Sequence, residues 1–143
     1  MYIYTVVFLM KVIPIMASAG ISGFESPASE YSDLGLSIED LIIKNPNATF
    51  IGQATGTSMI GVGIFDKDIL VVDRAVQRKN HDVIVCTYNG EFACKILDVD
   101  NRLLISANES IPPIRINELD SFRIEGTVIC SLRCHRPCYL PGE

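Results

Sequence analysis

Hydrophobic and polar residues form several short runs between residues 49 and 133. The runs are TFIGQATG (49–56), DILVVDRA (68–75), DVIVCTYNGEFACKILDV (82–99), RLLISANE (102–109) and FRIEGTVICSLR (122–133). Apolar runs this short, bounded by turn residues, are typical of β-strands. Asn89-Gly90 divides the third run into two strands, because both positions of a tight hairpin turn need residues that tolerate positive φ. The pattern predicts a mostly β, antiparallel domain.

A single short helix is expected before these strands, in the segment SIEDLIIKNP. Ser37 is suited to the N-cap, and Asp40 follows three residues later in the position of a capping box. Leu41 and Ile42 are expected to be buried, and Pro46 is expected to stop the helix.

The first 36 residues differ in composition from the rest of the chain. Residues 1–16 are mostly apolar, and residues 20–36 are rich in Ser, Gly, Pro, Ala and Glu without a sustained period. The second stretch is therefore expected to be an exposed linker that a protease can reach. We predict an N-terminal arm with a cleavage linker over residues 1–36 and a β-rich domain over residues 37–143.

A secretory signal peptide is an alternative explanation of the apolar start, with Ala17-Ser18-Ala19 before the cut. Residues 1–10 carry no positive side chain, however, and Lys11 interrupts the apolar stretch. The stretch is also shorter than the roughly 20 residues that span a bilayer. We favour an arm that packs on the protein or on a second copy, and we expect no membrane association.

Charge and cysteine content narrow the possible functions. The 143 residues carry a net charge of −5 with scattered Lys and Arg, which argues against direct nucleic-acid binding.

Five cysteines, none in a C-x-x-C pair, do not form a complete disulfide framework and fit a reducing, cytoplasmic location. Cys130, Cys134 and Cys138 with His135 have a spacing that suggests metal ligands on a helix, but the segment is predicted to be a strand with a loose tail. We expect no metal and no other cofactor.

Two residues are candidates for catalysis. Ser58 lies in the small-residue loop GTSMIGVGIFDKD, whose backbone N–H groups can converge on one point. Lys95 lies among apolar residues of a predicted strand, where lysine is rare unless it is paired, snorkelling or functional. An ordinary glycine-rich loop and a solvent-facing edge lysine are the simpler explanations of each alone. The pair together is more specific than either residue.

A serine hydroxyl needs a base to become a good nucleophile, and the usual base is histidine. His81 and His135 are the two histidines of the chain, and neither has a recognisable aspartate context in the sequence. A lysine can serve instead when it is neutral, a form that burial favours.

Four segments resemble UmuD-like proteins of the LexA-type self-cleaving serine peptidases, in the same order and at similar separations. They are GFESPASEY, NPNATF, ATGTSMIGVGIFDKDILVVDRA and NGEFACKIL. The resemblance implies a compact β domain of the LexA and signal-peptidase type that works as a homodimer. It also implies that Ser58 is the nucleophile and Lys95 the general base, with backbone N–H groups of Thr57 and Ser58 forming the oxyanion site.

The same resemblance implies that the chain cuts itself between a small residue and glycine. The matching bond is Ser22-Gly23, and Ala19-Gly20 is the alternative three residues earlier. The implied role is in the SOS response to DNA damage. A RecA filament on single-stranded DNA stimulates cleavage, and the processed dimer joins a Y-family translesion DNA polymerase.

The chain departs from the family pattern at three positions. Thr57 stands where relatives often carry Asp, Gly61 where an acidic residue is common, and His81 where Gly is usual.

Two other functions stay open. One is a membrane-associated type I signal peptidase, although Gly61 replaces the proline usual in those enzymes. The other is a polymerase-binding module that does not cleave.

Overall fold

The computed structural model describes residues 37–138, which belong to two units. Residues 37–44 are part of one unit and residues 45–138 part of the other. The first unit contains helix α2 (Ile38–Ile42). The Ser37 hydroxyl accepts a hydrogen bond of 3.0 Å from the Asp40 N–H, as the predicted N-cap requires.

The expected burial of Leu41 and Ile42 is wrong. Leu41 is 56% exposed, and α2 contains no buried residue. Five residues make less than two turns. A helix this short cannot present the continuous apolar stripe that a longer helix turns toward a core.

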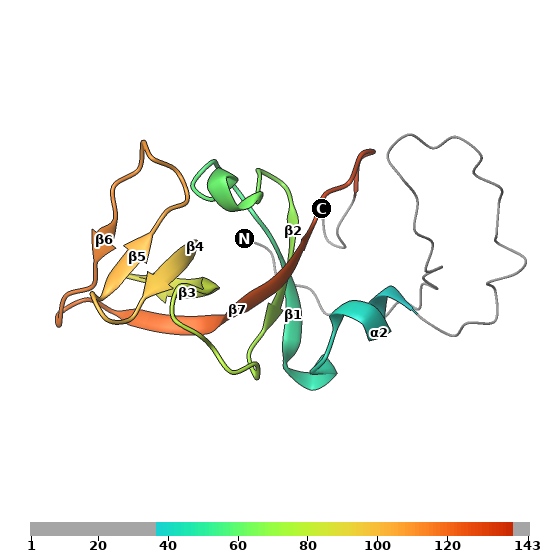
Figure 1. Ribbon diagram of the computed structural model, residues 1–143, viewed down its shortest axis with the longest axis horizontal. Coiled ribbons are helices and arrows are strands. Elements are labelled where there is room, and N and C mark those ends of the chain that lie inside the picture. The colour runs from blue at the N-terminus through green and yellow to red at the C-terminus, as the bar shows by residue number, and fades with distance from the viewer. Residues whose placement is uncertain (1–36, 139–143) are drawn as a thin grey trace, which may run out of the picture. The chain divides into compact units, whose positions relative to one another are not determined.

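Residues 45–138 form a seven-stranded sheet in the order β1-β2-β7-β3-β4-β5-β6 (Figure 1). All neighbouring strands are antiparallel, which confirms the mostly β, antiparallel fold predicted from the sequence. The strands are β1 (Thr49–Gln53), β2 (Ile69–Asp73), β3 (Val83–Tyr88), β4 (Glu91–Asp98), β5 (Leu103–Ile105), β6 (Ile114–Arg115) and β7 (Phe122–Leu132). The sequence did not predict β6, because two residues are too few to establish an alternating pattern.

The long strand β7 connects the two halves of the sheet. Its first half pairs with β3 and its second half with β2, so β1 and β2 lie at one end of the strand and β3 to β6 at the other (Figure 1). Both pairings contain a register shift, and such irregularities bend and twist a strand. A Cβ atom at Gly126 would lie 2.6 Å from a methyl of Val72, so β2 and β7 approach too closely there for any larger residue.

Two apolar clusters stabilise this bent sheet. The first includes Leu70, Val72 and Val85, which are all fully buried, and the second includes Ile84 and Cys86. Neighbouring residues of β3 thus contribute to different clusters, because successive side chains of a strand point to opposite faces. The first cluster is the one that anchors the candidate site.

Two turns bear out details of the sequence. Asn89 and Gly90 have φ values of 48° and 86°, as the predicted tight hairpin requires. His81, at the position where the family resemblance implies glycine, has a φ of 70°. Glycine adopts this left-handed conformation with the least strain. No helix within residues 37–138 has the length and hydrophobicity needed to cross a lipid bilayer.

Candidate active site

Ser58 lies in the loop between β1 and β2, and this loop is anchored at its base and in its middle. The Ala54 N–H donates to the Asp68 carbonyl, and the Lys67 N–H donates to the Ala54 carbonyl, both at 2.8 Å. Met59 is only 3% exposed and packs in the first apolar cluster. Burial of Met59 fixes the backbone next to Ser58, whose own side chain stays half-buried. A short 3₁₀ helix, η2 (Ile60–Val62), follows directly.

The segment after β5 holds the loop that carries Ser58, residues 54–68, from a second side. The Asn108 side-chain amide donates to the Thr57 carbonyl at 3.0 Å, and the Gly61 N–H donates to the Ala107 carbonyl at 2.7 Å. A Cβ atom on residue 61 would lie 2.7 Å from the same Ala107 oxygen. The close approach explains why this chain has glycine at position 61.

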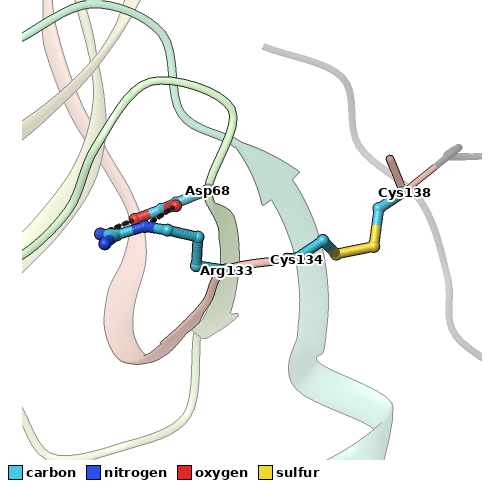
Figure 2. The surroundings of a disulfide bond; sticks show 4 residues. All are labelled: Asp68, Arg133, Cys134 and Cys138. Atoms are coloured by element: carbon cyan, nitrogen blue, oxygen red, sulfur yellow. Dashed lines mark hydrogen bonds and ion pairs between the residues drawn. A yellow bond between two sulfur atoms is a disulfide. The ribbon is translucent and has the colours of Figure 1, made fainter. Parts of the chain in front are cut away.

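An ion pair fixes the far end of the loop (Figure 2). Arg133 donates from Nε to one carboxylate oxygen of Asp68 at 2.9 Å and from a terminal nitrogen to the other at 3.0 Å. The same terminal nitrogen donates to the Gly63 carbonyl, and the guanidinium lies 4.1 Å from the centre of the Phe65 ring. Arg133 thus joins the end of β7 to the loop that carries Ser58.

The hydrogen bonds from Arg133 lower the pKa of Asp68, and the Phe65 N–H, which donates to the same carboxylate at 2.8 Å, acts in the same direction. Burial opposes them, because Asp68 is only 3% exposed. The attractive contacts prevail, so the carboxylate stays ionised within the fold.

The candidate base enters the site from strand β4. Lys95 is paired with Ile84 of β3 and is half-buried, rather than the solvent-facing edge lysine of the simpler explanation. Its Nζ atom donates a hydrogen bond of 2.7 Å to the hydroxyl of Ser106. Within residues 37–138 the hydrogen bond of this amine therefore goes to Ser106 and not to Ser58.

The structure nevertheless brings Ser58 and Lys95 together. Both line one pocket of about 200 Å³, with mostly apolar or small neighbours that include Ala54, Met59, Ile64, Leu70, Ala93 and Cys94. The pocket is formed by elements that are far apart in sequence, namely the β1–β2 loop and strand β4. Among residues 37–138, no acceptor binds the backbone N–H groups of Thr57 and Ser58, the pair predicted to form the oxyanion site.

The cysteine thiols near the pocket are poor nucleophiles in this fold. Burial raises the pKa of Cys94, which lines the pocket, to about 12 and that of Cys86 to about 11. A thiol reacts as its thiolate. At neutral pH both thiols are therefore protonated, and the Ser58 hydroxyl is the nucleophile candidate that a base can activate.

The C-terminal cysteines differ from expectation. Cys134 and Cys138 form a disulfide bond directly after Arg133, where the sequence suggested a loose tail (Figure 2). Cys130 is a free thiol within β7. Because the sulfurs of Cys134 and Cys138 are bonded to each other, the three sulfurs are not available together as metal ligands.

His81 has a carboxylate partner that the sequence did not reveal. Its Nε2 atom lies 3.7 Å from a carboxylate oxygen of Asp98. No sequence context marks this contact, because the fold brings Asp98 of β4 to a residue that precedes β3. The His81 side chain is 60% exposed and does not line the pocket of Ser58, so this pair is not placed to activate that hydroxyl.

Two residues of the site were missed from the sequence, and four candidates lie beyond the described residues. Ser106 contacts the candidate base and Asn108 contacts the loop that carries Ser58, but a small polar residue after a strand gives no local indication of such contacts. The candidate cleavage residues Ser22, Gly23, Ala19 and Gly20 are not among the described residues.

Comparison with known proteins gives the class to which this fold and site belong. Residues 11–129 match the model of the "Peptidase S24-like" family, and the chain belongs to that family. The similarity to UmuD-like members of the LexA and UmuD group is thereby confirmed.

Particular relatives agree with this assignment. The chain is 35% identical to Protein ImpA of Salmonella typhimurium over 71% of this chain and 66% of ImpA, just under two thirds of that protein. It is 32% identical to Protein MucA of Escherichia coli over 88% of each chain. It is also 37% identical to a LexA repressor of Syntrophotalea carbinolica, over 61% of this chain and 44% of the repressor.

Proposed function

We propose that this protein is a self-cleaving serine peptidase in which Ser58 is the nucleophile and Lys95 the general base. The observation that carries the proposal is that both side chains, chosen from the sequence, line the same pocket. The match to the Peptidase S24-like family supports it independently. The exposed His81 and its buried partner Asp98 do not line this pocket, which leaves Lys95 as the basic side chain among the residues that line the pocket with Ser58.

The reaction is an acyl transfer. Neutral Lys95 takes the proton of the Ser58 hydroxyl, and the oxygen attacks the carbonyl carbon of Ser22. Backbone N–H groups of Thr57 and Ser58 donate to the resulting oxyanion. The bond to the Gly23 nitrogen then breaks, and that nitrogen leaves with the proton held by Lys95. Water hydrolyses the ester, with Lys95 again accepting a proton, and releases the new carboxyl end at Ser22.

The lining of the pocket supports a substrate with an uncharged side chain before the cut bond. Its walls are mainly apolar or small side chains, among them Ala54, Met59, Ile64 and Leu70. Both candidate bonds, Ser22-Gly23 and Ala19-Gly20, meet this condition. Glycine after the bond lets the substrate backbone approach the loop closely.

The cellular role that we propose follows the UmuD-like relatives. Cleavage removes the first 22 residues in the cytoplasm, stimulated by a RecA filament on single-stranded DNA during the SOS response. The remaining chain acts as a homodimer and as the accessory subunit of a Y-family translesion DNA polymerase. The acidic balance of the chain supports action through protein partners rather than direct nucleic-acid binding.

A module that binds the polymerase without cleaving is the second candidate. The hydrogen bond of Lys95 to Ser106 rather than to Ser58 favours this alternative, because a base must reach the proton that it removes. Ser58 lines the same pocket as Lys95, and direct measurement of cleavage decides between the two candidates.

The test is self-cleavage of the purified full-length chain at alkaline pH, where lysine loses its proton more readily. We expect two fragments from the wild type, and at least about 100-fold slower cleavage for Ser58→Ala and for Lys95→Ala. Fragment masses distinguish a cut after Ser22 from one after Ala19. Ser131→Ala and Lys79→Ala, which change exposed residues outside the pocket, are matched controls and should cleave like the wild type.

Two further measurements test the proposed partners. RecA with single-stranded DNA and a nucleotide should speed cleavage of the wild type near neutral pH, and RecA without DNA should not. The cleaved chain should elute as a dimer and bind a Y-family polymerase more tightly than the Ser58→Ala chain. A wild type that stays intact at every pH, with or without RecA, would leave only the non-cleaving module.

A further inference from the structure

The register of β4 and β5 places a second hydroxyl beside the candidate base. Ile96 of β4 pairs with Ile105 of β5 in antiparallel register, and continuing that register puts Ser106 opposite Lys95. Ser106 is 8% exposed, and its hydroxyl accepts the 2.7 Å hydrogen bond from the Lys95 amine. A buried hydroxyl in contact with a functional amine needs an explanation beyond the packing of the sheet.

We propose that Ser106 is a positioning residue for Lys95, an inference that rests on the proposed peptidase function. A neutral lysine amine has two N–H groups and one lone pair. When one N–H is donated to Ser106, rotation of the amine is restricted and the lone pair remains available for the proton of Ser58. Without that acceptor, the flexible four-carbon side chain samples positions from which it cannot take the proton.

The chain around Ser106 supports this role, because the same short segment holds the nucleophile. Ala107 accepts from the Gly61 N–H, and Asn108 donates to the Thr57 carbonyl. Residues 106–108 therefore contact both the base and the loop that carries Ser58. A segment with this double attachment links the position of Lys95 to that of the loop that carries Ser58.

The experiment compares three variants of Ser106 in the full-length chain. Ser106→Thr keeps the hydroxyl, Ser106→Ala removes it, and Ser106→Cys nearly preserves its volume but supplies a weak acceptor. We expect the threonine variant to cleave within about fivefold of the wild type. The alanine and cysteine variants should cleave about 10- to 100-fold more slowly, the size of effect caused by a misplaced catalytic group.

Two additional readouts separate positioning from a loss of folding. The thermal midpoint of each variant is measured, and rates are compared well below the lowest midpoint. The rate at which a small phosphonofluoridate labels Ser58 should follow the cleavage rates, because that reaction also needs the base but not the substrate arm. Ser131→Ala, a change of an exposed serine outside the pocket, serves as the control and should match the wild type in both assays.

The possible results distinguish this inference from the proposed function. If the wild type cleaves and Ser106→Ala and Ser106→Cys cleave and label equally fast, the role of Ser106 is overturned while the peptidase stands. If the threonine variant is as slow as the alanine variant despite a normal thermal midpoint, the hydroxyl is not what matters and the inference also fails. If the wild type neither cleaves nor labels at Ser58, the peptidase itself is refuted.

Discussion

The free cysteine thiols within residues 37–138 differ in reactivity because their surroundings differ. Cys94 lies directly before Lys95, yet burial raises the pKa of its thiol to about 12, compared with about 11 for Cys86. Cys130, in β7, also has a raised pKa because of burial. Each increase reduces the fraction of reactive thiolate at neutral pH.

The first prediction concerns these three free thiols. At pH 7.5 we expect iodoacetamide to modify Cys130 first and Cys94 and Cys86 far more slowly. From ordinary values of 9.0, pKa values of about 11 and about 12 reduce the thiolate fraction about 100- and 1000-fold. Mass spectrometry of digested protein measures the order, and urea-unfolded protein is the control in which all three react. Early modification of Cys86 would show that the core opens more often than its burial implies.

A second prediction concerns the carboxylate of Asp68. Its pKa is lowered in the folded state from the ordinary value of 3.8, so its ionised form adds stability above that pH. This contribution is lost as the pH falls through the lowered value. Asp68→Asn should therefore unfold at lower urea than the wild type at pH 7, and the two midpoints should approach each other as the pH falls below 3.8. Glu118→Gln, an exposed change, is the control.

At the scale of elements, the position of the loop that carries Ser58 depends on Gly61, which contacts the segment after β5. A Cβ atom at residue 61 would meet the Ala107 carbonyl oxygen at 2.7 Å, a backbone atom that cannot rotate away. Gly61→Ala should therefore displace the loop, destabilise the protein by about 1–3 kcal/mol and slow self-cleavage at least about 10-fold. Urea unfolding and cleavage rates measure the two effects.

The matched control for this substitution is Val62→Ala in the same 3₁₀ helix. The Val62 side chain is 45% exposed, so its truncation should leave stability and cleavage nearly unchanged. Wild-type cleavage by Gly61→Ala would mean that the contact with residues 106–108 does not set the position of Ser58.

At the scale of the whole molecule, the pocket depends on the first apolar cluster. Leu70 of β2 is fully buried, belongs to this cluster and also lines the pocket. Leu70→Ala should cost about 2–5 kcal/mol of unfolding free energy through lost burial and a cavity. Denaturant unfolding tests this, with Val76→Ala as the control at a position that is 38% exposed. A cost below about 1 kcal/mol would indicate that the cluster rearranges to fill the space.

The strands and the hairpin could be predicted because they depend on local preferences. Alternating apolar residues need one face buried, and Asn89-Gly90 meets the positive φ of its turn whatever the rest of the fold does. The N-cap at Ser37 is local in the same way. Local rules failed for Leu41, because burial of a helical side chain depends on whether another surface covers it.

The sequence by itself determined the antiparallel β class and, through the family resemblance, the choice of Ser58 and Lys95. Only the tertiary structure decided that these two side chains share a pocket and that Ser106, Asn108 and Arg133 hold its parts. The reason is physical. A turn or a strand is set by neighbouring residues, whereas a hydrogen bond between residues 51 or 65 positions apart exists only after the sheet has brought them together.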